Sequence, residues 1–264
     1  MAFWGHGRNL QSSNPDGVKE FWKRLWMKKA DWWFAYTELT ENILVKNGYP
    51  SNRITVVNNA VDTKELLEFS DEIQPGELMA LKDNLRITGT RVGIFCGALY
   101  PEKKIEFLIK AAQKIKEGLK DFELIIIGAG PDAGIATKAA QECPWIYYVG
   151  PKFGREKVIY MKLGHVFLVP GLVGLGILDA LAVGLPLFTT DCKLHSPEIS
   201  YLQNSKNGYM TEDSVESYAS KIIEMLGDSA QLDSMKTNCK LDAEKYTVEE
   251  MVNRFASGLL SCLS

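Results

Sequence analysis

The sequence predicts an α/β protein built on a Rossmann-like, doubly wound parallel sheet with helices on both faces. Three observations support this prediction. From residue 91 onward, short apolar runs alternate with helical patterns. The runs are apolar along most of their length, as in strands buried on both faces, and glycine or proline follows most of them. With 264 residues, 46% hydrophobic and 24% charged, the chain can form one large or two small domains.

The regular part of the chain has its elements in a simple alternation. Strands are predicted at residues 92–97, 124–128, 146–149, 166–169 and 187–190, with helices at residues 102–116, 133–142, 155–163 and 177–182 between them and three closing helices at residues 215–226, 230–245 and 248–260. The helix at residues 102–116 illustrates why helices are predicted: its apolar residues Ile105, Leu108, Ala112 and Ile115 recur at the spacing of one helix face. Such alternation is typical of a parallel sheet.

Residues 1–88 follow a less regular pattern. Strands are predicted at residues 2–4, 31–36 and 54–57, a helix capped by Thr37 or Thr40 ends near residues 47–50, and a further helix with a connector spans residues 66–89. A globular domain seldom begins on a buried strand, so we expect a chain truncated at its amino terminus. Residues 1–88 would be the remnant of a first Rossmann domain with a connector. Residues 89–264 would be the second, Rossmann-like domain, whose last helix is a candidate to cross back.

Residues 18–34 form a basic amphipathic pattern. Phe21, Trp22, Leu25 and Trp26 recur at helical spacing among basic side chains. Such a helix either packs on its own domain with a solvated basic face, or rests on an anionic membrane surface. We favour the first arrangement because it is the commoner one in globular proteins. The second would give the protein a peripheral contact with the inner face of the membrane.

Composition and charge argue against several classes of protein. The net charge of −3 gives no general attraction to nucleic acid. The five cysteines are scattered and include no C-x-x-C pair, which indicates reduced thiols in the cytoplasm. No apolar run is long enough to span a bilayer, and the first residues lack the apolar segment of a signal peptide. We therefore expect a cytoplasmic protein.

The stretch at residues 166–198 contains the main candidate site. Its first strand is followed by a turn with Gly171, Gly174 and Gly176, and then by the helix at residues 177–182. In a parallel sheet such a turn presents free N–H groups and the positive end of a helix dipole, which suit an anionic ligand. Asp179 is a carboxylate in an otherwise apolar helix. It either faces this crevice and accepts hydrogen bonds from sugar hydroxyls, or lies solvated on the outer face.

A lysine follows the first strand of the regular part. Lys103 lies at the expected start of the helix at residues 102–116, in the turn that begins at Gly97. Because the dipole at a helix N-terminus is positive, a lysine there suggests an anionic partner such as a diphosphate. The alternative is a surface lysine paired with Glu102 or Glu106.

The Gly128-Ala129-Gly130 turn invites a dinucleotide interpretation, since it follows a strand and opens a helix. Two observations argue against NAD or FAD. The strand is the second of its domain, and the next strand ends at Gly150 without a carboxylate to hold a ribose. The less specific interpretation is a tight strand-to-helix turn that lies beside a nucleotide.

His195 and Glu198 follow the fifth strand. Pro197 and Glu198 form an ordinary helix start, from which Glu198 could approach a sugar hydroxyl, whereas a single histidine such as His195 is more often a loop residue than a ligand. The sequence contains no zinc-protease, serine-hydrolase or P-loop motif, so we expect no bound transition metal, no serine hydrolase and no P-loop ATPase.

Taken in order, these segments resemble the glycosyltransferase family 4 enzymes of the GT-B fold. The resemblance rests on five motifs in the family's order: an Asn-Asn-Ala-Val-Asp turn at residues 58–62, the turn at residues 97–103, the strand and turn at residues 124–131, Gly150, and the helix at residues 178–186. His6, in a Trp-Gly-His-Gly segment, resembles the histidine-glycine of the family's amino-terminal domain. Any one motif is weak, but five at fitting distances are specific.

The resemblance implies transfer of a sugar, with retention at the anomeric carbon, from a nucleotide-diphosphate sugar to a glycan or lipid-linked acceptor. The acceptor class would be a cell-surface polysaccharide or a glycolipid such as lipopolysaccharide. Residues 89–264 would bind the donor, residues 1–88 would belong to the acceptor domain, and neither a metal nor another cofactor would be needed. By resemblance, the catalytic candidates are His6, Lys103 and Glu198, and the donor-binding candidates are Gly97, Lys103, Gly128, Gly150, Gly174, Leu175, Gly176 and Asp179.

Three features depart from the family pattern. The family's paired acids, separated by seven residues, are Gly171 and Asp179 here, and the turn arginine is Ala98. On the expectation of a truncated chain, most of the amino-terminal domain would be absent. We therefore hypothesise that Glu198 takes over some contacts to the donor sugar. Two alternatives stay open: a non-catalytic module that binds nucleotide sugars, and an NAD-type Rossmann oxidoreductase.

Overall fold

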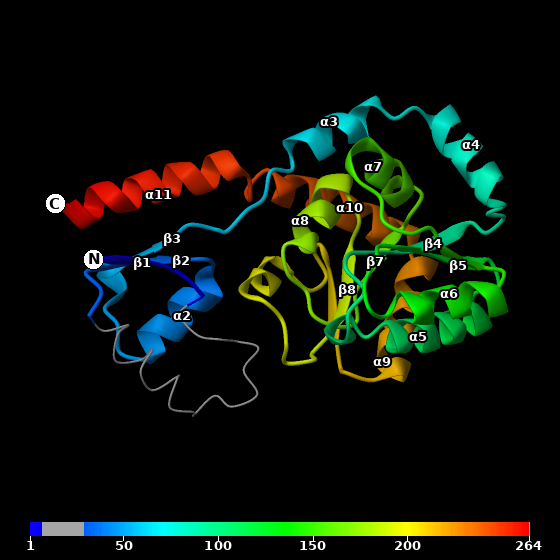
Figure 1. The fold of residues 1–264 in the computed structure, drawn as a ribbon, viewed down its shortest axis with the longest axis horizontal. Helices are drawn as coiled ribbons and strands as arrows, with labels where there is room; N and C mark the ends of the chain where they lie inside the picture. Colours follow the sequence, from blue (N-terminus) through cyan, green and yellow to red (C-terminus); the bar gives the residue numbers. More distant parts are fainter. Residues whose placement is uncertain (7–28, 264) are drawn as a thin grey trace.

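The computed structural model describes residues 1–6 and 29–263, which form two parallel sheets (Figure 1). The larger sheet has the order β6-β5-β4-β7-β8-β9, and all of its strands are parallel. Its strands are β4 (Arg91–Cys96), β5 (Phe122–Ile127), β6 (Ile146–Tyr148), β7 (Val166–Leu168), β8 (Leu187–Thr190) and β9 (Gly208–Thr211). The chain builds outward from β4 in one direction and from β7 in the other, which is the doubly wound arrangement predicted from the sequence.

Helices cover both faces of this sheet. They are α5 (Ile105–Gly118), α6 (Ala133–Glu142), α7 (Gly154–Lys162), α8 (Gly176–Val183), α9 (Val215–Gly227) and α10 (Ser229–Ala243). In Figure 1, α5, α6 and α9 lie on one side of the sheet, and α7, α8 and α10 lie on the other. All six residues of β5 are buried, and α8 has buried side chains around most of its circumference. The apolar runs of the sequence are therefore the centre of the core.

The predicted strands and helices of this part are all present, with two differences. The sequence pattern did not indicate β9, a short edge strand with only one buried residue. The helix start predicted at Pro197 and Glu198 is present, as the 3-10 helix η3 (Pro197–Tyr201). The helix expected from residue 102 begins instead at Ile105. Residues Pro101–Lys103 form the 3-10 turn η2, and Lys104 then takes a left-handed conformation with φ of 56° that interrupts the helical path.

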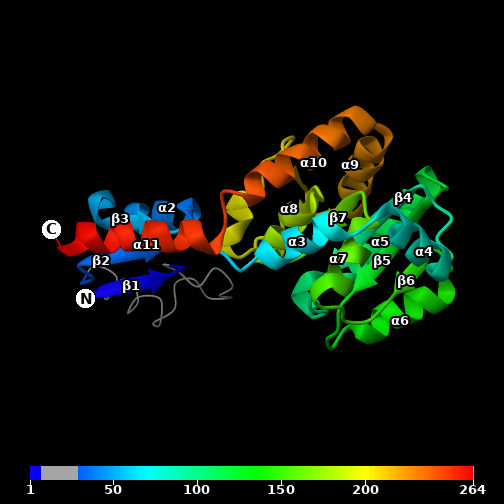
Figure 2. The same cartoon turned by 90° about the horizontal axis from the view of Figure 1, so that it is seen from above.

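The smaller sheet has the order β1-β2-β3, with parallel strands β1 (Ala2–Gly5), β2 (Trp32–Ala35) and β3 (Ile54–Val56). Helix α2 (Glu38–Lys46) lies on one side, and the last helix, α11 (Val248–Leu263), lies on the other (Figures 1 and 2). The Phe255 ring of α11 stacks on Phe34 of β2 at 4.0 Å between centroids. Gly258 is needed at this contact, because an added Cβ would lie 2.4 Å from the Thr55 hydroxyl.

The amino-terminal part differs from two of the expectations. Residues 18–28 of the basic amphipathic segment lie outside the described residues, and Trp32–Ala35 form a strand, so the helical pattern does not extend to residue 34. Thr37 occupies the N-cap position of α2, but neither it nor Thr40 caps the helix. The Thr37 hydroxyl instead donates a hydrogen bond to the carbonyl oxygen of Pro197, at 3.2 Å.

The two sheets are joined by helices α3 (Lys64–Glu72) and α4 (Pro75–Leu85) and by the return of the chain through α11. Helix α3 packs against α7 and α8, and α2 contacts η3. In the described residues, no helix combines the length and the apolar character needed to cross a membrane.

Candidate functional site

The candidate site lies at the carboxyl ends of β4 and β7, the neighbouring strands between which the strand order reverses. In doubly wound sheets, ligands bind in the crevice outside this point. The segment after β4 carries the predicted residues from Gly97 to Lys103, and residues 169–176 connect β7 to α8. We refer to residues 169–176 as the β7–α8 loop.

Three of the predicted glycines line one edge of the sheet. The Gly97 N–H donates to the carbonyl oxygen of Ile127, and the Gly128 N–H donates to that of Gly150, each at 3.0 Å. Gly128 has a φ of 148°, and an added Cβ would lie 1.8 Å from the carbonyl oxygen of Gly97, so only glycine fits there. At Gly97 and Gly150, an added Cβ would meet no atom within 4 Å. The backbone therefore faces open space at these two positions.

Lys103 is tied to the β7–α8 loop. Its Nζ donates to the carbonyl oxygen of Leu172 at 2.5 Å, and the Leu172 N–H donates to the carbonyl oxygen of Glu102 at 2.8 Å. Burial lowers the pKa of the Lys103 ammonium to about 8, because desolvation disfavours the charged form. Glu106 pairs with Lys110 at 2.8 Å, so it does not neutralise Lys103. The half-buried cation thus points at the loop that precedes α8.

The position of Gly171 leaves no room for the first acid of the pattern that the sequence resembles. An added Cβ at Gly171 would lie 2.1 Å from the carbonyl oxygen of Glu102 and 2.8 Å from the Cα of Lys103. No side chain fits in that space while η2 and the β7–α8 loop stay in contact. The departure from the family pattern therefore belongs to the same packing that positions Lys103.

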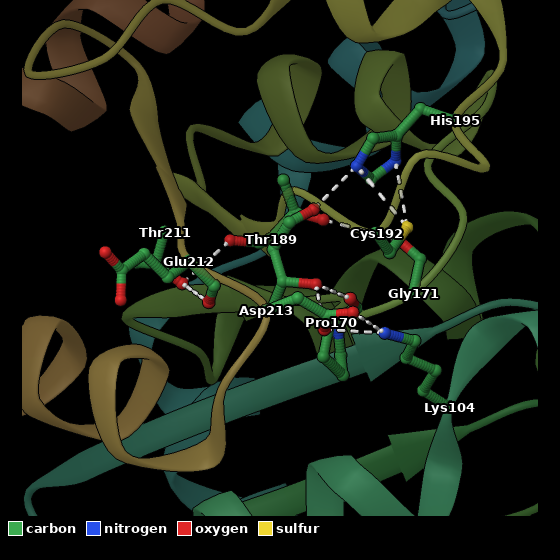
Figure 3. Close-up of polar contacts among 10 residues, drawn as sticks. Lys104, Pro170, Gly171, Thr189, Cys192, His195, Thr211, Glu212 and Asp213 are labelled. Atoms are coloured by element: carbon green, nitrogen blue, oxygen red, sulfur yellow. Dashed lines mark hydrogen bonds and ion pairs between the residues drawn. The ribbon is translucent and has the colours of Figure 1, made fainter.

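His195 holds the other side of this loop (Figure 3). Its Nδ1 accepts a hydrogen bond from the Val173 N–H at 3.1 Å. Its Nε2 donates to the carbonyl oxygen of Thr190 at 2.7 Å. One ring nitrogen accepts and the other donates, which is the pattern of neutral imidazole. Burial lowers the pKa of His195 and favours this form. His195 is thus a positioning residue for the loop.

Below His195, Lys104 and Asp213 face each other, with 2.6 Å between Nζ and Oδ1 (Figure 3). The Thr190 hydroxyl lies between the carbonyl oxygen of Pro170, at 2.6 Å, and the Asp213 carboxylate, at 2.9 Å. These contacts fix the start of the β7–α8 loop against β8.

The end of the same loop offers backbone donors. Within the described part of the chain, the N–H groups of Gly174, Leu175 and Gly176 have no hydrogen-bond acceptor. They precede or open α8, whose eight residues add the positive end of the helix dipole. Three successive free N–H groups at a helix start form a site for an anion.

Asp179 lies in the first turn of α8, and its carboxylate is paired. Its Oδ2 lies 3.1 Å from the Nζ of Lys157 on α7, and its side chain is 24% exposed. Asp179 is therefore not a fully solvated side chain on an outer face. Lys157 could not be selected from the sequence, because a lysine in an amphipathic helix is ordinary.

Glu198 lies at the junction between the sheets. The carboxylate is buried, with a residue exposure of 3%, and its Oε1 accepts a hydrogen bond from the Nδ2 of Asn59 at 2.7 Å. The Tyr201 hydroxyl donates to the carbonyl oxygen of Asn59 at 2.9 Å. Asn59 belongs to the Asn-Asn-Ala-Val-Asp turn, so that motif joins the small sheet to η3. Sequence reasoning identified the turn but not this partner of Glu198.

His6 follows β1 on the small sheet. Its ring is exposed and lies 4.5 Å from the ring of Tyr36.

The structure thus gathers Lys103, Gly174, Leu175, Gly176 and Asp179 around the β7–α8 loop. Glu198 is at the junction, and His6 is on the other sheet. Their roles toward a donor remain predictions. Among the described residues, no three His, Cys, Asp or Glu side chains are grouped as metal ligands.

Comparison with solved structures supports the fold. The crystal structure of Anabaena Alr3699/HepE in complex with UDP aligns with a TM-score of 0.79 at 14% identity, covering 98% of this chain and 72% of that one. The pneumococcal O-GlcNAc transferase GtfA, in complex with UDP and GlcNAc, aligns with a TM-score of 0.72 at 19% identity, covering 99% and 52%. The lipopolysaccharide outer core galactosyltransferase WaaB aligns with a TM-score of 0.64 at 17% identity, covering 88% and 62%. No curated protein sequence matches the chain.

The family comparison identifies the class of protein. The family model described as "Glycosyl transferases group 1" matches residues 90–228, which is more than half of the chain and contains β4 to α9 with the whole β7–α8 loop. This match favours glycosyl transfer over the NAD-type alternative. The chain therefore belongs to the group 1 glycosyltransferases, and it is a glycosyltransferase enzyme with a Rossmann-like carboxyl-terminal domain.

Proposed function

We propose that the protein is a family 4 enzyme that transfers a sugar, with retention, from a nucleotide-diphosphate sugar to a glycan or lipid-linked acceptor. The observation that carries this proposal is the β7–α8 loop. The loop carries three free N–H groups at the start of α8, the half-buried Lys103 ammonium of η2 contacts it, and the Asp179 carboxylate lies one turn further along. This is the arrangement that a diphosphate joined to a ribose requires.

The diphosphate is held at the loop. When the bond between the anomeric carbon and the diphosphate oxygen breaks, the electron pair leaves with the phosphate, and negative charge grows there. The N–H groups of Gly174, Leu175 and Gly176, with the ammonium of Lys103, stabilise that charge. Because Gly171 and His195 fix the loop in advance, little reorganisation accompanies the reaction.

The nucleoside extends along the carboxyl ends of the strands that Gly97, Gly128 and Gly150 follow. The Asp179 carboxylate accepts hydrogen bonds from the ribose hydroxyls, and the open space at Gly97 and Gly150 leaves room for the sugar and the base. The solved relatives that contain UDP support a uracil nucleotide as the first donor to test.

Residues 89–264 are proposed to form the donor-binding domain, and residues 1–88 to contribute the acceptor side, including His6. The similarity to WaaB, a lipopolysaccharide galactosyltransferase by name, supports a glycolipid or polysaccharide as acceptor. The five free cysteines support a cytoplasmic setting.

The test is a thermal-shift panel of UDP-, GDP- and ADP-sugars, followed by product analysis with the donor that binds. One nucleotide class should raise the melting temperature, because a ligand that binds only the folded state stabilises it. The configuration of the product at the anomeric carbon then tests retention. Absence of binding by every nucleotide sugar would contradict the proposal, and binding without turnover would indicate a non-catalytic nucleotide-sugar-binding module.

A further inference from the structure

Lys157 and Asp179 form an ion pair that the sequence did not indicate. The 3.1 Å contact joins the Lys157 Nζ, on α7, to the Asp179 Oδ2, on α8, and the two side chains are only 19% and 24% exposed. Cys96 ends β4, and its thiol lies close enough to feel both charges, although burial is the main reason that its pKa rises to about 12. The pair therefore lies near the carboxyl end of β4, beside the point where the strand order reverses, which we call the switch point.

The bonding capacity of this pair is only partly used. Within the described part of the chain, Asp179 Oδ1 accepts no hydrogen bond, and the ammonium of Lys157 makes no hydrogen bond or ion pair other than that with Oδ2. A carboxylate held through one oxygen has its other oxygen aimed in a fixed direction. Two charges this far from solvent carry a desolvation cost that a surface pair lacks. The arrangement keeps one carboxylate oxygen oriented and available for a ligand.

We propose that Lys157 is a positioning residue that holds the Asp179 carboxylate so that Oδ1 accepts a hydrogen bond from a ribose hydroxyl of the donor. This inference rests on the proposed function, because it needs a nucleotide at the switch point. Lys157 acts through Asp179 and does not itself contact the phosphates. It thereby makes the site select donors that carry ribose hydroxyls.

The test compares two ligands on one set of variants. Calorimetry measures the affinity of a ribonucleoside diphosphate and of its 2′,3′-dideoxy analogue, with the base that wild type prefers, for wild type, Lys157→Met, Asp179→Asn and the double variant. Lys157→Met should weaken the ribonucleotide about tenfold, the size of one lost charge-assisted hydrogen bond. The affinity of Lys157→Met for the dideoxy analogue should equal that of wild type. Lys157→Arg should retain most of the wild-type affinity for the ribonucleotide.

The double variant should be no weaker than Asp179→Asn alone, since both changes remove the same contact. Lys236→Met serves as the matched control. It breaks a pair of similar length, 3.0 Å to Asp233, on α10, and should change neither affinity. Circular dichroism confirms that each variant is folded.

Three results would overturn the inference. The first is an equal loss of affinity for both ligands in Lys157→Met, which would indicate contact with the phosphates. The others are losses of affinity that add in the double variant, and no loss of affinity in Lys157→Met. If wild type binds the ribonucleotide and the variants give one of these three results, this inference fails and the proposed function stands. Wild type that binds no nucleoside diphosphate defeats the proposed function as well.

Discussion

At the scale of single residues, Lys103 combines a charge with burial. Its ammonium lies against the Leu172 carbonyl, and burial lowers its pKa to about 8, well below that of an exposed lysine. A diphosphate beside it would favour the charged form and raise its pKa again. Donor binding is therefore coupled to protonation in the pH range just above neutrality.

We expect the affinity for a nucleotide sugar to be constant below pH 7.5 and to fall about tenfold per pH unit above pH 8. The sign follows because the free protein loses a proton through its lowered pKa, while the complex keeps that proton. A nucleotide sugar is the right ligand, since its diphosphate has no second ionisation in this range. Calorimetry between pH 6.5 and 9.5 measures the effect.

Lys103→Arg separates this explanation from general pH effects, because arginine stays charged throughout. Its affinity should show no decline above pH 8, and Lys103→Met should bind weakly at every pH. A decline of equal slope in Lys103→Arg would contradict the assignment.

At the scale of elements, the β7–α8 loop and η2 are one packed unit. Gly171 lies against the backbone of Glu102 and Lys103, and the Leu172 N–H and carbonyl oxygen both bond to this turn. Restoring the family's acid with Gly171→Glu should therefore not improve the enzyme. We expect it to destabilise the fold by about 2–4 kcal/mol, because backbone atoms at 2.1 Å cannot yield as a flexible side chain can.

Urea unfolding checks this expectation, and Gly176→Ala is the matched control. An added Cβ at Gly176, in the same segment, meets no atom within 4 Å, so that variant should stay within about 1 kcal/mol of wild type. A stable Gly171→Glu with tighter donor binding would show that the loop and η2 separate easily.

The same elements show what the sequence could predict. Periodicity and glycine spacing were enough for the strands from β4 to β8 and for the position of the β7–α8 loop, because buried strands are apolar throughout and turns need special backbone. The missed β9 is a short edge strand with little burial, so it has no such pattern. Lys157 beside Asp179, and Asn59 beside Glu198, are contacts between distant segments. Such pairs depend on how helices and turns pack, which spacing along one segment does not encode.

At the scale of the whole molecule, the junction between the sheets determines where His6 lies relative to the donor site. Buried Glu198 on η3 accepts a hydrogen bond from Asn59 in the turn after β3, and the Thr37 hydroxyl donates to the neighbouring Pro197. A buried carboxylate that loses its partner is costly, typically about 1–3 kcal/mol or more. This pair is therefore expected to couple the small sheet to the large one.

A double-mutant cycle on Asn59→Ala and Glu198→Ala should give a coupling free energy of about 1–3 kcal/mol in urea unfolding. The exposed pair Lys221–Glu224, at 2.6 Å, is the control and should couple by less than about 1 kcal/mol. Glu198→Gln keeps an acceptor for Asn59 and should lose less stability than Glu198→Ala. Additive losses at the junction would contradict the coupling.

The same variants decide how Glu198 affects the donor. If Glu198 contacts the donor sugar, as we hypothesised from the sequence's departures from the family pattern, calorimetry should show a large loss of affinity in Glu198→Ala and a small one in Asn59→Ala. If Glu198 acts only by joining the sheets, the two variants should lose affinity equally, and turnover should fall further than affinity, because His6 on the small sheet would be misplaced while the β7–α8 loop stays intact. Unchanged donor binding in both variants would remove Glu198 from the donor site and leave it as a structural link.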